Sequence, residues 1–570
     1  MEHFYSAEKN VQMLLFLLKQ YNIKKIVVSP GATNVCFVAS LQIDPYFELY
    51  SCVDERSAAY MAVGMAAESE EPIVLSCTGA TSSRNYMPAL TEAYYRKLPI
   101  IAVTSSMDNS LVGHLWAQVT DRSEYPNDIV VDGVYAQNIR NSNDEWDCSI
   151  KLNSILQRFR LEPCGPVHIN LATGIGGGYG VKELPKFPII NLYLKEDKFP
   201  SLPSEGNIGI FVGEHKRFSQ KETEAIDMFC ATNNAVVFCD HTSHYYGKYR
   251  YQHALVGAQE HYRNTIGDIS LLIHIGEMSG DYDTICGIVP DKVWRVSNDG
   301  QFKDRFKKLR AVFAMQEIDF FNHYIDKNKP LNSQYLRKCI DNYSNLFSQI
   351  PQLPLSNILV AKTLAPKIPK GSLLYLGILN TLRSWNYFNV ENGVETISNV
   401  GGFGIDGIMS SMIGASFLDN QRLCFAILGD LSFFYDMNCL GNRHIGGNVR
   451  ILLINNGHGQ EFENYTHAAS FLGNEVNKYV AAEGHFGRKS IDLVKHYSED
   501  LGFEYISAKS KDEFLLNYKL FVNPIIEEKP MIFEVFTNAK DENEALRCLK
   551  NIVNNDGVLR KIKDVVRKMF

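Results

Sequence analysis

The sequence of 570 residues lacks the features that mark several large classes of protein. Its 12 cysteines are scattered, with no C-x-x-C pair and no cluster with histidines, which argues against a structural zinc site and a disulfide framework. No apolar run reaches the roughly 18–20 residues that span a bilayer, and no secretory cleavage site follows Met13–Leu18. We therefore expect a cytoplasmic protein with no membrane-spanning segment.

Blocks of basic residues are also missing. The formal net charge is −7, and the basic C-terminal segment RKIKDVVRKMF is short and typical of the polar face of a terminal helix. Both observations argue against a nucleic-acid partner. The length, with 45% apolar and 21% charged residues, is that of a soluble enzyme with three or four domains.

Short apolar runs alternate with helical segments along the whole chain, which predicts three doubly wound α/β domains with parallel sheets. We place these domains at residues 1–185, 200–345 and 355–570, and expect Ser333–Leu355 to be a linker. Thr466–His485 could form a mobile loop, and the last 30 residues are predicted to be helical. The predicted strands are Lys25–Ser29, Pro72–Cys77, Pro99–Thr104, Val167–Leu171, Ile208–Val212, Ala235–Cys239, Leu271–Ile275, Val293–Val296, Ser372–Leu376, Leu423–Leu428 and Val449–Ile454.

Two of these strands end abruptly in polar residues. Gly429-Asp430 follows the first, and Asn455-Asn456-Gly457 follows the second, with a predicted crossover helix between them. Open parallel sheets bind ligands at the carboxyl ends of their strands. Asp430 and Asn456 should therefore lie side by side, and their hard oxygen atoms suit Mg²⁺ with a bound phosphate.

This segment resembles the signature of the thiamin diphosphate (ThDP) enzymes of the acetolactate synthase/decarboxylase superfamily. In that signature GD is followed about 26–28 residues later by NN, each after an apolar run. The resemblance implies that Asp430, Asn456 and the main-chain carbonyl of His458 hold Mg²⁺. It also implies a pyrimidine-binding domain, a spacer domain and a diphosphate-binding domain, in that order. The common form of the motif has GDG, whereas Leu431 follows Asp430 here.

Glu55 lies in the segment DERSAAYMAVGMA, which is similar to the cofactor-activating segment of the same family. There a buried glutamate hydrogen-bonds N1′ of the cofactor's aminopyrimidine and favours the tautomer that removes the C2 proton. A carboxylate suits this task because desolvation raises its proton affinity. The alternative is a surface charge that is compatible with the dipole of a helix start.

A glycine-rich segment precedes the GD motif. Gly402, Gly404 and Gly407 match the dinucleotide pattern G-x-G-x-x-G, but they open no N-terminal βαβ unit. The resemblance instead assigns them to the diphosphate, with Ile405 beneath the thiazolium. The cofactor-binding residues that it implies are Glu55, Gly402, Gly404, Ile405, Asp406, Gly429, Asp430, Leu431, Ser432, Asn456, Gly459 and Gln460.

Within the superfamily the chain is most similar to the SEPHCHC synthases of the menaquinone pathway, which join decarboxylated 2-oxoglutarate to isochorismate. The matching pieces include SPG at 29–31, EAYY at 92–95 and NN-x-x-GQ-x-F at 455–462. Those synthases hold two polycarboxylates with basic residues, of which Arg383 alone remains. The matching positions here carry Thr33, Met107, Val400 and Asp281-Tyr282, and Glu461 stands where an aliphatic residue faces the substrate.

We therefore predict a ThDP- and Mg²⁺-dependent enzyme that decarboxylates a 2-oxo acid and transfers the acyl group to an aldehyde or ketone. Glu55, Gln118 and Glu461 are the predicted catalytic residues, with His114 and His467 as further acid–base candidates. Because Glu55 and the GD motif fall in different domains, the resemblance implies a homodimer or homotetramer. The alternatives are a divergent SEPHCHC synthase, a non-catalytic cofactor-binding protein and a nicotinamide oxidoreductase.

Overall fold

The computed structural model describes residues 4–122, 125–174, 178–260, 265–485 and 489–553. The chain forms two compact units. The first contains residues 1–200 and 293–316, and the second contains residues 201–292 and 317–570. Among the described residues, no helix combines the length and the apolar character that crossing a bilayer requires. The boundaries of the three predicted domains stay a prediction.

The first unit is built on a six-stranded sheet in the order β3-β2-β4-β5-β7-β6, in which every pair of neighbours is parallel. Its strands are β2 (Lys25–Val28), β3 (Glu48–Ser51), β4 (Ile73–Thr78), β5 (Ile100–Ser106), β6 (Asp132–Ala136) and β7 (Val167–Ala172). The α-helices are α1 (Lys9–Gln20), α2 (Val35–Gln42), α3 (Glu55–Ser69), α4 (Thr81–Asn85), α5 (Met87–Tyr95) and α6 (Ser142–Ile155). A small antiparallel pair joins β1 (Tyr5–Ser6) to β8 (Tyr179–Val181).

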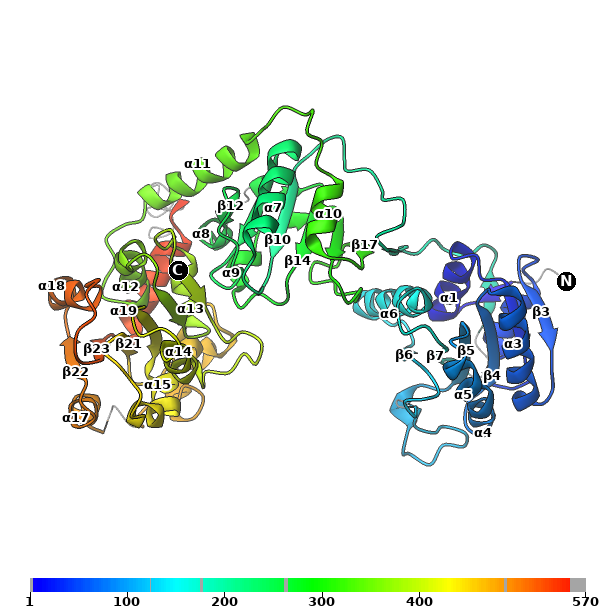
Figure 1. Ribbon diagram of the computed structural model, residues 1–570. Coiled ribbons are helices and arrows are strands. Elements are labelled where there is room, and N and C mark those ends of the chain that lie inside the picture. Colours follow the sequence, from blue (N-terminus) through cyan, green and yellow to red (C-terminus); the bar gives the residue numbers. More distant parts are fainter. Residues whose placement is uncertain (1–3, 123–124, 175–177, 261–264, 486–488, 554–570) are drawn as a thin grey trace, which may run out of the picture. The chain divides into compact units, whose positions relative to one another are not determined.

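Both faces of this sheet are covered, as its near-continuous apolar strands require. Ile26 and Val74 belong to a core on one face, whereas their neighbours Val27 and Leu75 belong to a core on the other. The helices on the two sides of the sheet are visible in Figure 1. The prediction of a doubly wound parallel fold is confirmed.

The middle of the chain contributes further parallel strands. In the second unit β12 (Arg250–Gln252), β11 (Ala235–Cys239), β10 (Ile208–Val212) and β14 (Leu271–Ile275) pair in that order. In the first unit β16 (Val293–Val296), β17 (Leu309–Phe313) and β9 (Asn191–Tyr193) pair in that order. A short parallel pair joins β13 (Asp268–Ile269) to β15 (Val289–Pro290). The helices are α7 (Gln220–Asn233), α8 (Ala254–Gly257), α9 (Tyr282–Ile285), α10 (Glu317–His323) and α11 (Gln334–Ser348).

The last sheet has the order β19-β18-β20-β21-β23-β22 and is parallel throughout. Its strands are β18 (Leu373–Leu376), β19 (Glu395–Ile397), β20 (Cys424–Gly429), β21 (Val449–Asn455), β22 (Glu504–Ala508) and β23 (Met531–Phe536). The α-helices are α12 (Asn357–Leu364), α13 (Asn380–Asn386), α14 (Ile408–Ser416), α15 (Asp430–Asp436), α16 (Gln460–Glu463), α17 (Leu493–Asp500), α18 (Lys511–Phe521) and α19 (Ala539–Lys550).

Two sequence-based expectations need correction. Most of the predicted linker Ser333–Leu355 is the helix α11, whose buried residues Tyr335, Cys339 and Leu346 recur at helical spacing among polar neighbours. The predicted loop Thr466–His485 contains the 3₁₀ segment Ala468–Lys478. The prediction of a helical C-terminus agrees with α19 for part of its length, and residues 554–570 lie outside the described residues.

Candidate active site

The ends of β20 and β21 bring the two halves of the GD and NN motif together. Gly429 is the register partner of Ile454, so Asp430 and Asn456 continue from adjacent strand ends. Asp430 is 3% exposed and accepts hydrogen bonds from the main-chain N–H groups of Leu431 (2.8 Å) and Gly457 (2.5 Å). Gly457 has a φ of +80°, which favours glycine at this turn. The predicted juxtaposition of the two side chains agrees with this geometry.

A cavity of about 200 Å³ opens at these strand ends. Its wall contains ten of the predicted site residues, from three separate segments: Ile405, Gly429, Asp430, Leu431, Ser432, Asn456, His458, Gly459, Gln460 and Glu461. The hydroxyl of Ser432 donates to the main-chain oxygen of Ile405 and so ties two of the segments together. The predicted site residues Gly402, Gly404 and Asp406 are not among the residues that line the cavity.

The donor set at these strand ends fits Mg²⁺ better than a transition metal. Asp430 supplies a carboxylate and Asn456 an amide oxygen, which are hard ligands. The imidazole of His458 is engaged elsewhere, with Nε2 at 2.9 Å from Gln460 Oε1 and 3.6 Å from Glu463. Within the described ranges, no group of three His, Cys, Asp or Glu side chains is arranged to hold a metal ion.

A buried glutamate that the sequence analysis missed supports this region. Glu534 on β23 is fully buried and accepts hydrogen bonds from Asn455 Nδ2 (2.6 Å) and the Tyr505 hydroxyl (2.7 Å). Burial raises the pKa of the Glu534 carboxyl against the opposing effect of these two bonds, and the charge of Asp430 raises it further. The signal in the sequence was a single Glu inside the apolar strand MIFEVF, since a buried acid needs partners.

The opposite wall of the cavity starts from a strained residue. Leu379 precedes α13 and has φ +63°, an uncommon conformation for a side chain without a local hydrogen-bonding group. The next residue, Asn380, accepts a hydrogen bond from Asn464 Nδ2 at 2.8 Å. Strain of this kind costs about 1–3 kcal/mol and clusters at ligand sites. Leu379 and Asn380 both line the cavity.

Arg383 and Glu461 form a two-pronged ion pair beside this wall. Both guanidinium nitrogens Nη1 and Nη2 lie 2.9 Å from the carboxylate oxygens of Glu461. The side chains are 16% and 18% exposed. Burial lowers the pKa of the Arg383 guanidinium, but the hydrogen bonds and charge of Glu461 outweigh this effect and raise it. The one arginine that was expected to hold a substrate carboxylate is therefore neutralised by the protein itself.

The cavity is acidic. Asp430, Glu461 and Glu542 line it, and none of the described residues in its wall is a lysine or an arginine. Glu542 on α19 accepts hydrogen bonds from the main-chain N–H of Asn357 with both oxygens, at 3.0 and 3.1 Å. Burial raises the pKa of Glu542 to about 7. The sequence analysis did not single out this residue, because a Glu in the first turn of a helix is common.

In the first unit, Glu55 is the first residue of α3, and Asp54 caps the helix by accepting from Ser57 N–H at 2.7 Å. Glu55 is half-buried in its own unit and accepts a hydrogen bond from Asn85 Nδ2 at 3.5 Å. It lies after β3, at the carboxyl edge of the sheet, where a ligand is expected.

The other acid–base candidates differ in their surroundings. Gln118 and His114 are exposed, and Gln118 has φ +63°. His467 begins the 3₁₀ segment Ala468–Lys478, where its Nδ1 accepts from Ala469 N–H at 3.0 Å, and its ring packs edge-on against Phe462. His467 thus has a structural role in the described chain.

The positions that replace basic residues are mostly structural as well. Thr33 is buried and donates to the main-chain oxygen of Ser105 at 2.6 Å. Val400 is 1% exposed and packs against Gly280, where a Cβ atom would meet it at 2.4 Å. Asp281 caps α9 by accepting from Asp283 N–H and Thr284 N–H, and its burial raises its pKa to about 7.

Comparison with known proteins indicates the class of enzyme to which the chain is similar. Residues 9–125 match the family described as "Thiamine pyrophosphate enzyme, N-terminal TPP binding domain", thiamine pyrophosphate being another name for ThDP. With the strand-end site described above, the chain is a thiamin diphosphate-dependent enzyme.

Relatives of this chain are named 2-succinyl-5-enolpyruvyl-6-hydroxy-3-cyclohexene-1-carboxylate synthase, the SEPHCHC synthase. One from Bacteroides thetaiotaomicron is 27% identical in an alignment 576 positions long, which covers 96% of this chain and 98% of the relative. One from Phocaeicola vulgatus is 27% identical in an alignment 575 positions long, which covers 95% of this chain and 98% of the relative. The solved structure of the Rhodococcus jostii RHA1 thiamine diphosphate-dependent 4-hydroxybenzoylformate decarboxylase is 13% identical, with a TM-score of 0.38 and coverage of 93% and 99%.

Proposed function

We propose that the protein is a ThDP- and Mg²⁺-dependent 2-oxo acid decarboxylase and carboligase. It would decarboxylate a 2-oxo acid and join the remaining acyl group to an aldehyde or ketone acceptor. We further propose that it acts in the cytoplasm as a homodimer or homotetramer. The observation that carries the proposal is the acidic cavity at the ends of β20 and β21, with Arg383 paired to Glu461 beside it.

This geometry supports an assignment of the residues that would hold the cofactor. Asp430, Asn456 and the main-chain carbonyl of His458 would bind Mg²⁺, and Gly429 and Gly459 would let the diphosphate approach the backbone. Ile405 would support the thiazolium. When bound, ThDP would supply the nucleophilic carbon that decarboxylation of a 2-oxo acid requires. Glu55 would hold the proton at the aminopyrimidine nitrogen, and Gln118 and Glu461 would orient the substrate.

The charge of the cavity supports an acceptor with few carboxylates. A guanidinium that binds a carboxylate through two hydrogen bonds contributes roughly 1.5–3 kcal/mol. Arg383 gives this contact to Glu461, with a further hydrogen bond to Asn380 Oδ1 at 3.0 Å. A second carboxylate in the substrate would find no free cation in the cavity wall, because the charges of Arg383 and Glu461 cancel. An uncharged acceptor, such as a hydroxylated ketone, needs no such cation.

The second candidate is a divergent SEPHCHC synthase. It is favoured by the similarity to the synthases of B. thetaiotaomicron and P. vulgatus, which extends over 96% and 95% of this chain. Formation of product from isochorismate and 2-oxoglutarate at rates typical of enzymes would establish this candidate instead.

A melting-temperature screen followed by an activity screen tests the proposal. ThDP with Mg²⁺ should raise the melting temperature, because a ligand at 100 times its Kd stabilises the folded state by about 2.7 kcal/mol. NAD(H) should leave the melting temperature unchanged. Release of CO₂ from a panel of 2-oxo acids, with and without aldehyde or ketone acceptors, then identifies the donor. Without stabilisation by ThDP and Mg²⁺ the proposal fails, and tight NAD(H) binding would favour a nicotinamide oxidoreductase.

A further inference from the structure

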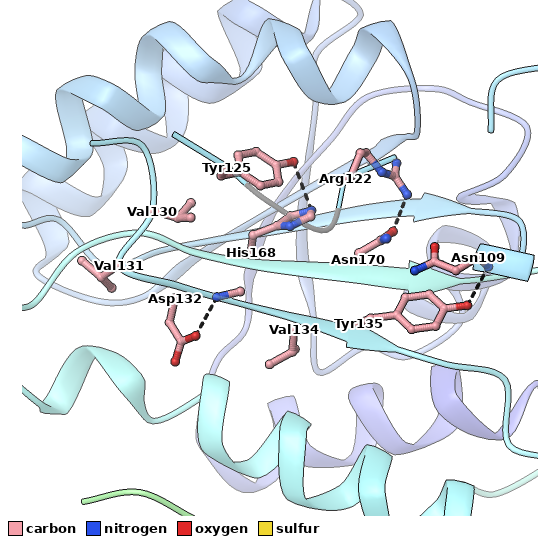
Figure 2. A pocket seen from close by; sticks show the side chains of 11 residues that line it. Asn109, Arg122, Tyr125, Val130, Val131, Asp132, Val134, Tyr135, His168 and Asn170 are labelled. Carbon is pink, nitrogen blue, oxygen red and sulfur yellow. Dashed lines mark hydrogen bonds between the residues drawn. The ribbon is translucent and has the colours of Figure 1, made fainter. Parts of the chain in front are cut away.

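A second cavity, of about 270 Å³, lies on the sheet of the first unit. Figure 2 shows its polar side chains, which come from separate segments: Asn109, Arg122 and Tyr125 from the region after β5, Tyr135 from β6, and His168 and Asn170 from β7. Val130, Val131 and Val134 supply an apolar wall. Cavities that hold drug-sized ligands start at about 300 Å³. The cavity therefore suits a small molecule with an apolar or aromatic part.

Arg122 is the cation of this cavity, and no carboxylate among the described residues neutralises its charge. The side chain is 7% exposed, and no carboxylate among the described residues forms an ion pair with it. Its Nη2 donates to two neutral groups, Ser106 Oγ and Asn170 Oδ1. The buried Nε and Nη1 atoms have no hydrogen-bond partner. Each buried donor left without a partner costs about 1–3 kcal/mol, and more when charged.

The burial of Arg122 is energetically unfavourable in the ligand-free chain. Burial lowers the pKa of the Arg122 guanidinium, and the nearby charge of Arg84 lowers it further. Nη1 lies against Gly79, where a Cβ atom would meet it at 2.5 Å. A side chain at position 79 would therefore require the guanidinium to shift. An unmatched buried cation of this kind points to an anion that pairs with it at some stage.

Apart from Asp132, the other polar groups of the cavity are neutral. Burial lowers the pKa of His168 to about 3, and its Nε2 lies 2.7 Å from Thr104 Oγ1 and 3.2 Å from the Tyr125 hydroxyl. Asp132 is a carboxylate of the lining, and it lies 3.8 Å from Arg158 Nε and accepts from Gly133 N–H at 2.8 Å. Arg122 is thus one cation without a counter-charge, which suits a single carboxylate.

The location of Arg122 connects it with Glu55. Ser106 is the last residue of β5 and Gly79 follows β4, so the guanidinium lies at the carboxyl edge of the sheet. Glu55 lies at the same edge, after β3. Both charges also act on the buried thiol of Cys77, whose pKa is raised to about 12, mainly by burial, with Glu55 raising it and Arg122 lowering it. The predicted catalytic glutamate and the unmatched arginine therefore lie at the same edge of the sheet.

We propose that Arg122 is a specificity-determining residue that binds the carboxylate of a small 2-oxo acid in this cavity. This inference rests on the proposed function, which supplies the 2-oxo acid. The guanidinium lies against Gly79 and lines the cavity, and rotation of its side-chain torsions would turn it further toward the cavity. The fork of the guanidinium then pairs with the planar carboxylate through two hydrogen bonds.

The test compares Arg122→Gln with Arg84→Gln, which removes the same charge from an exposed side chain nearby. Binding of phenylglyoxylate, an aromatic 2-oxo acid, and of its uncharged amide is measured by calorimetry. Arg122→Gln should weaken the acid by about 10- to 100-fold and leave the amide unchanged. Arg122→Lys, which keeps the charge without the fork, should give an intermediate loss. Arg84→Gln should bind both like the wild type.

The melting temperature of the ligand-free chain separates this role from a structural one. A carboxylate-binding Arg122 predicts that Arg122→Gln melts at the wild-type temperature or above it, because an unmatched buried cation is removed. A lower melting temperature, with equal losses for acid and amide, would identify a structural cross-link and overturn the inference, as would unchanged binding of the acid. Stabilisation by ThDP and Mg²⁺ is measured on the same samples. If ThDP and Mg²⁺ do not stabilise the wild type, the proposed function fails. If they stabilise it and Arg122→Gln still binds the acid as tightly as the wild type does, only this inference fails.

Discussion

The Arg383 guanidinium and the Glu461 carboxylate, 78 residues apart in sequence, hold each other through two hydrogen bonds of 2.9 Å. Arg383 belongs to α13 and Glu461 to α16, so the pair also links two segments of the cavity wall. The resemblance to the SEPHCHC synthases predicts that Arg383 recognises a substrate carboxylate. The pair with Glu461 cancels the charge of Arg383, and the lining of the cavity contains no lysine or arginine among the described residues.

Glu461→Gln should therefore change substrate preference. Loss of the carboxylate frees Arg383 to pair with a second carboxylate of the donor, a contact worth roughly 1.5–3 kcal/mol. We expect kcat/KM for 2-oxoglutarate to rise by about tenfold or more relative to that for 2-oxobutyrate. The free energy of unfolding should fall by about 1–3 kcal/mol, because a buried donor loses its charged acceptor.

The matched control is Glu475→Gln, which removes an exposed carboxylate paired with Lys478. It should change neither the ratio of the two kcat/KM values nor the free energy of unfolding measurably. Steady-state kinetics with both donors and chemical denaturation provide the measurements. Equal changes for 2-oxoglutarate and 2-oxobutyrate in Glu461→Gln would contradict the role assigned to the pair.

Asp430→Asn should abolish stabilisation by Mg²⁺ and ThDP. The substitution keeps the shape of the side chain and removes the charge that a divalent cation needs. The wild-type melting temperature should rise with ThDP and Mg²⁺, whereas that of the variant should stay within error. Asp419→Asn, at an exposed turn where Asp419 accepts from Gln421 N–H, is the control and should respond like the wild type. A variant that is still stabilised would remove Asp430 from the metal site.

Glu55→Gln should separate cofactor binding from catalysis. The amide keeps a hydrogen-bonding group but cannot accept the proton, so CO₂ release should fall by about 10²–10⁴-fold while ThDP still stabilises the chain. Glu68→Gln, an exposed position on the same helix α3, should retain full activity. An active Glu55→Gln enzyme would support the alternative of a surface charge at a helix start.

The strands were the most predictable part of the fold. Parallel strands buried on both faces must be apolar throughout, and the four runs predicted in the middle of the chain have the bounds of β10, β11, β14 and β16. Helix α11 was missed because its exposed face is polar and two prolines follow it, which resembles a linker. The pattern of α11 is visible only once its buried residues are known.

The site was predictable where chemistry leaves a local pattern. The GD and NN pair marks strand ends, and strand ends of a parallel sheet meet at one edge. The pairing of Arg383 with Glu461 leaves no such pattern, since 78 residues separate the two partners in sequence. Arg122 is missed for a similar reason, because its unmatched charge is a property of its burial rather than of its neighbours in sequence.

Glu542 should make stability fall as the pH rises. Burial raises its pKa from the model-peptide value of 4.5 to about 7. Between these values the unfolded chain releases the proton and the folded chain keeps it, so the folded state loses stability with rising pH, by about 3 kcal/mol at most. The free energy of unfolding of Glu542→Gln minus that of the wild type should grow from pH 4.5 to 7 and stay constant above. Chemical denaturation of both proteins at several pH values measures this difference in the free energy of unfolding. A difference that does not change with pH would contradict the raised pKa of Glu542.

Mixing two inactive variants tests the proposed homodimer. If the site takes Glu55 from one protomer and Asp430 from its partner, a hybrid of Glu55→Gln and Asp430→Asn contains one site with both native residues. Random exchange makes half of the dimers hybrids with one active site of two, so roughly a quarter of wild-type activity should return. If each chain builds its own site, every site in the mixture keeps one substitution and no activity returns. Subunit exchange is checked with a size tag on one variant, and activity is followed as CO₂ release. Recovery that requires exchange would establish that the functional unit contains at least two chains.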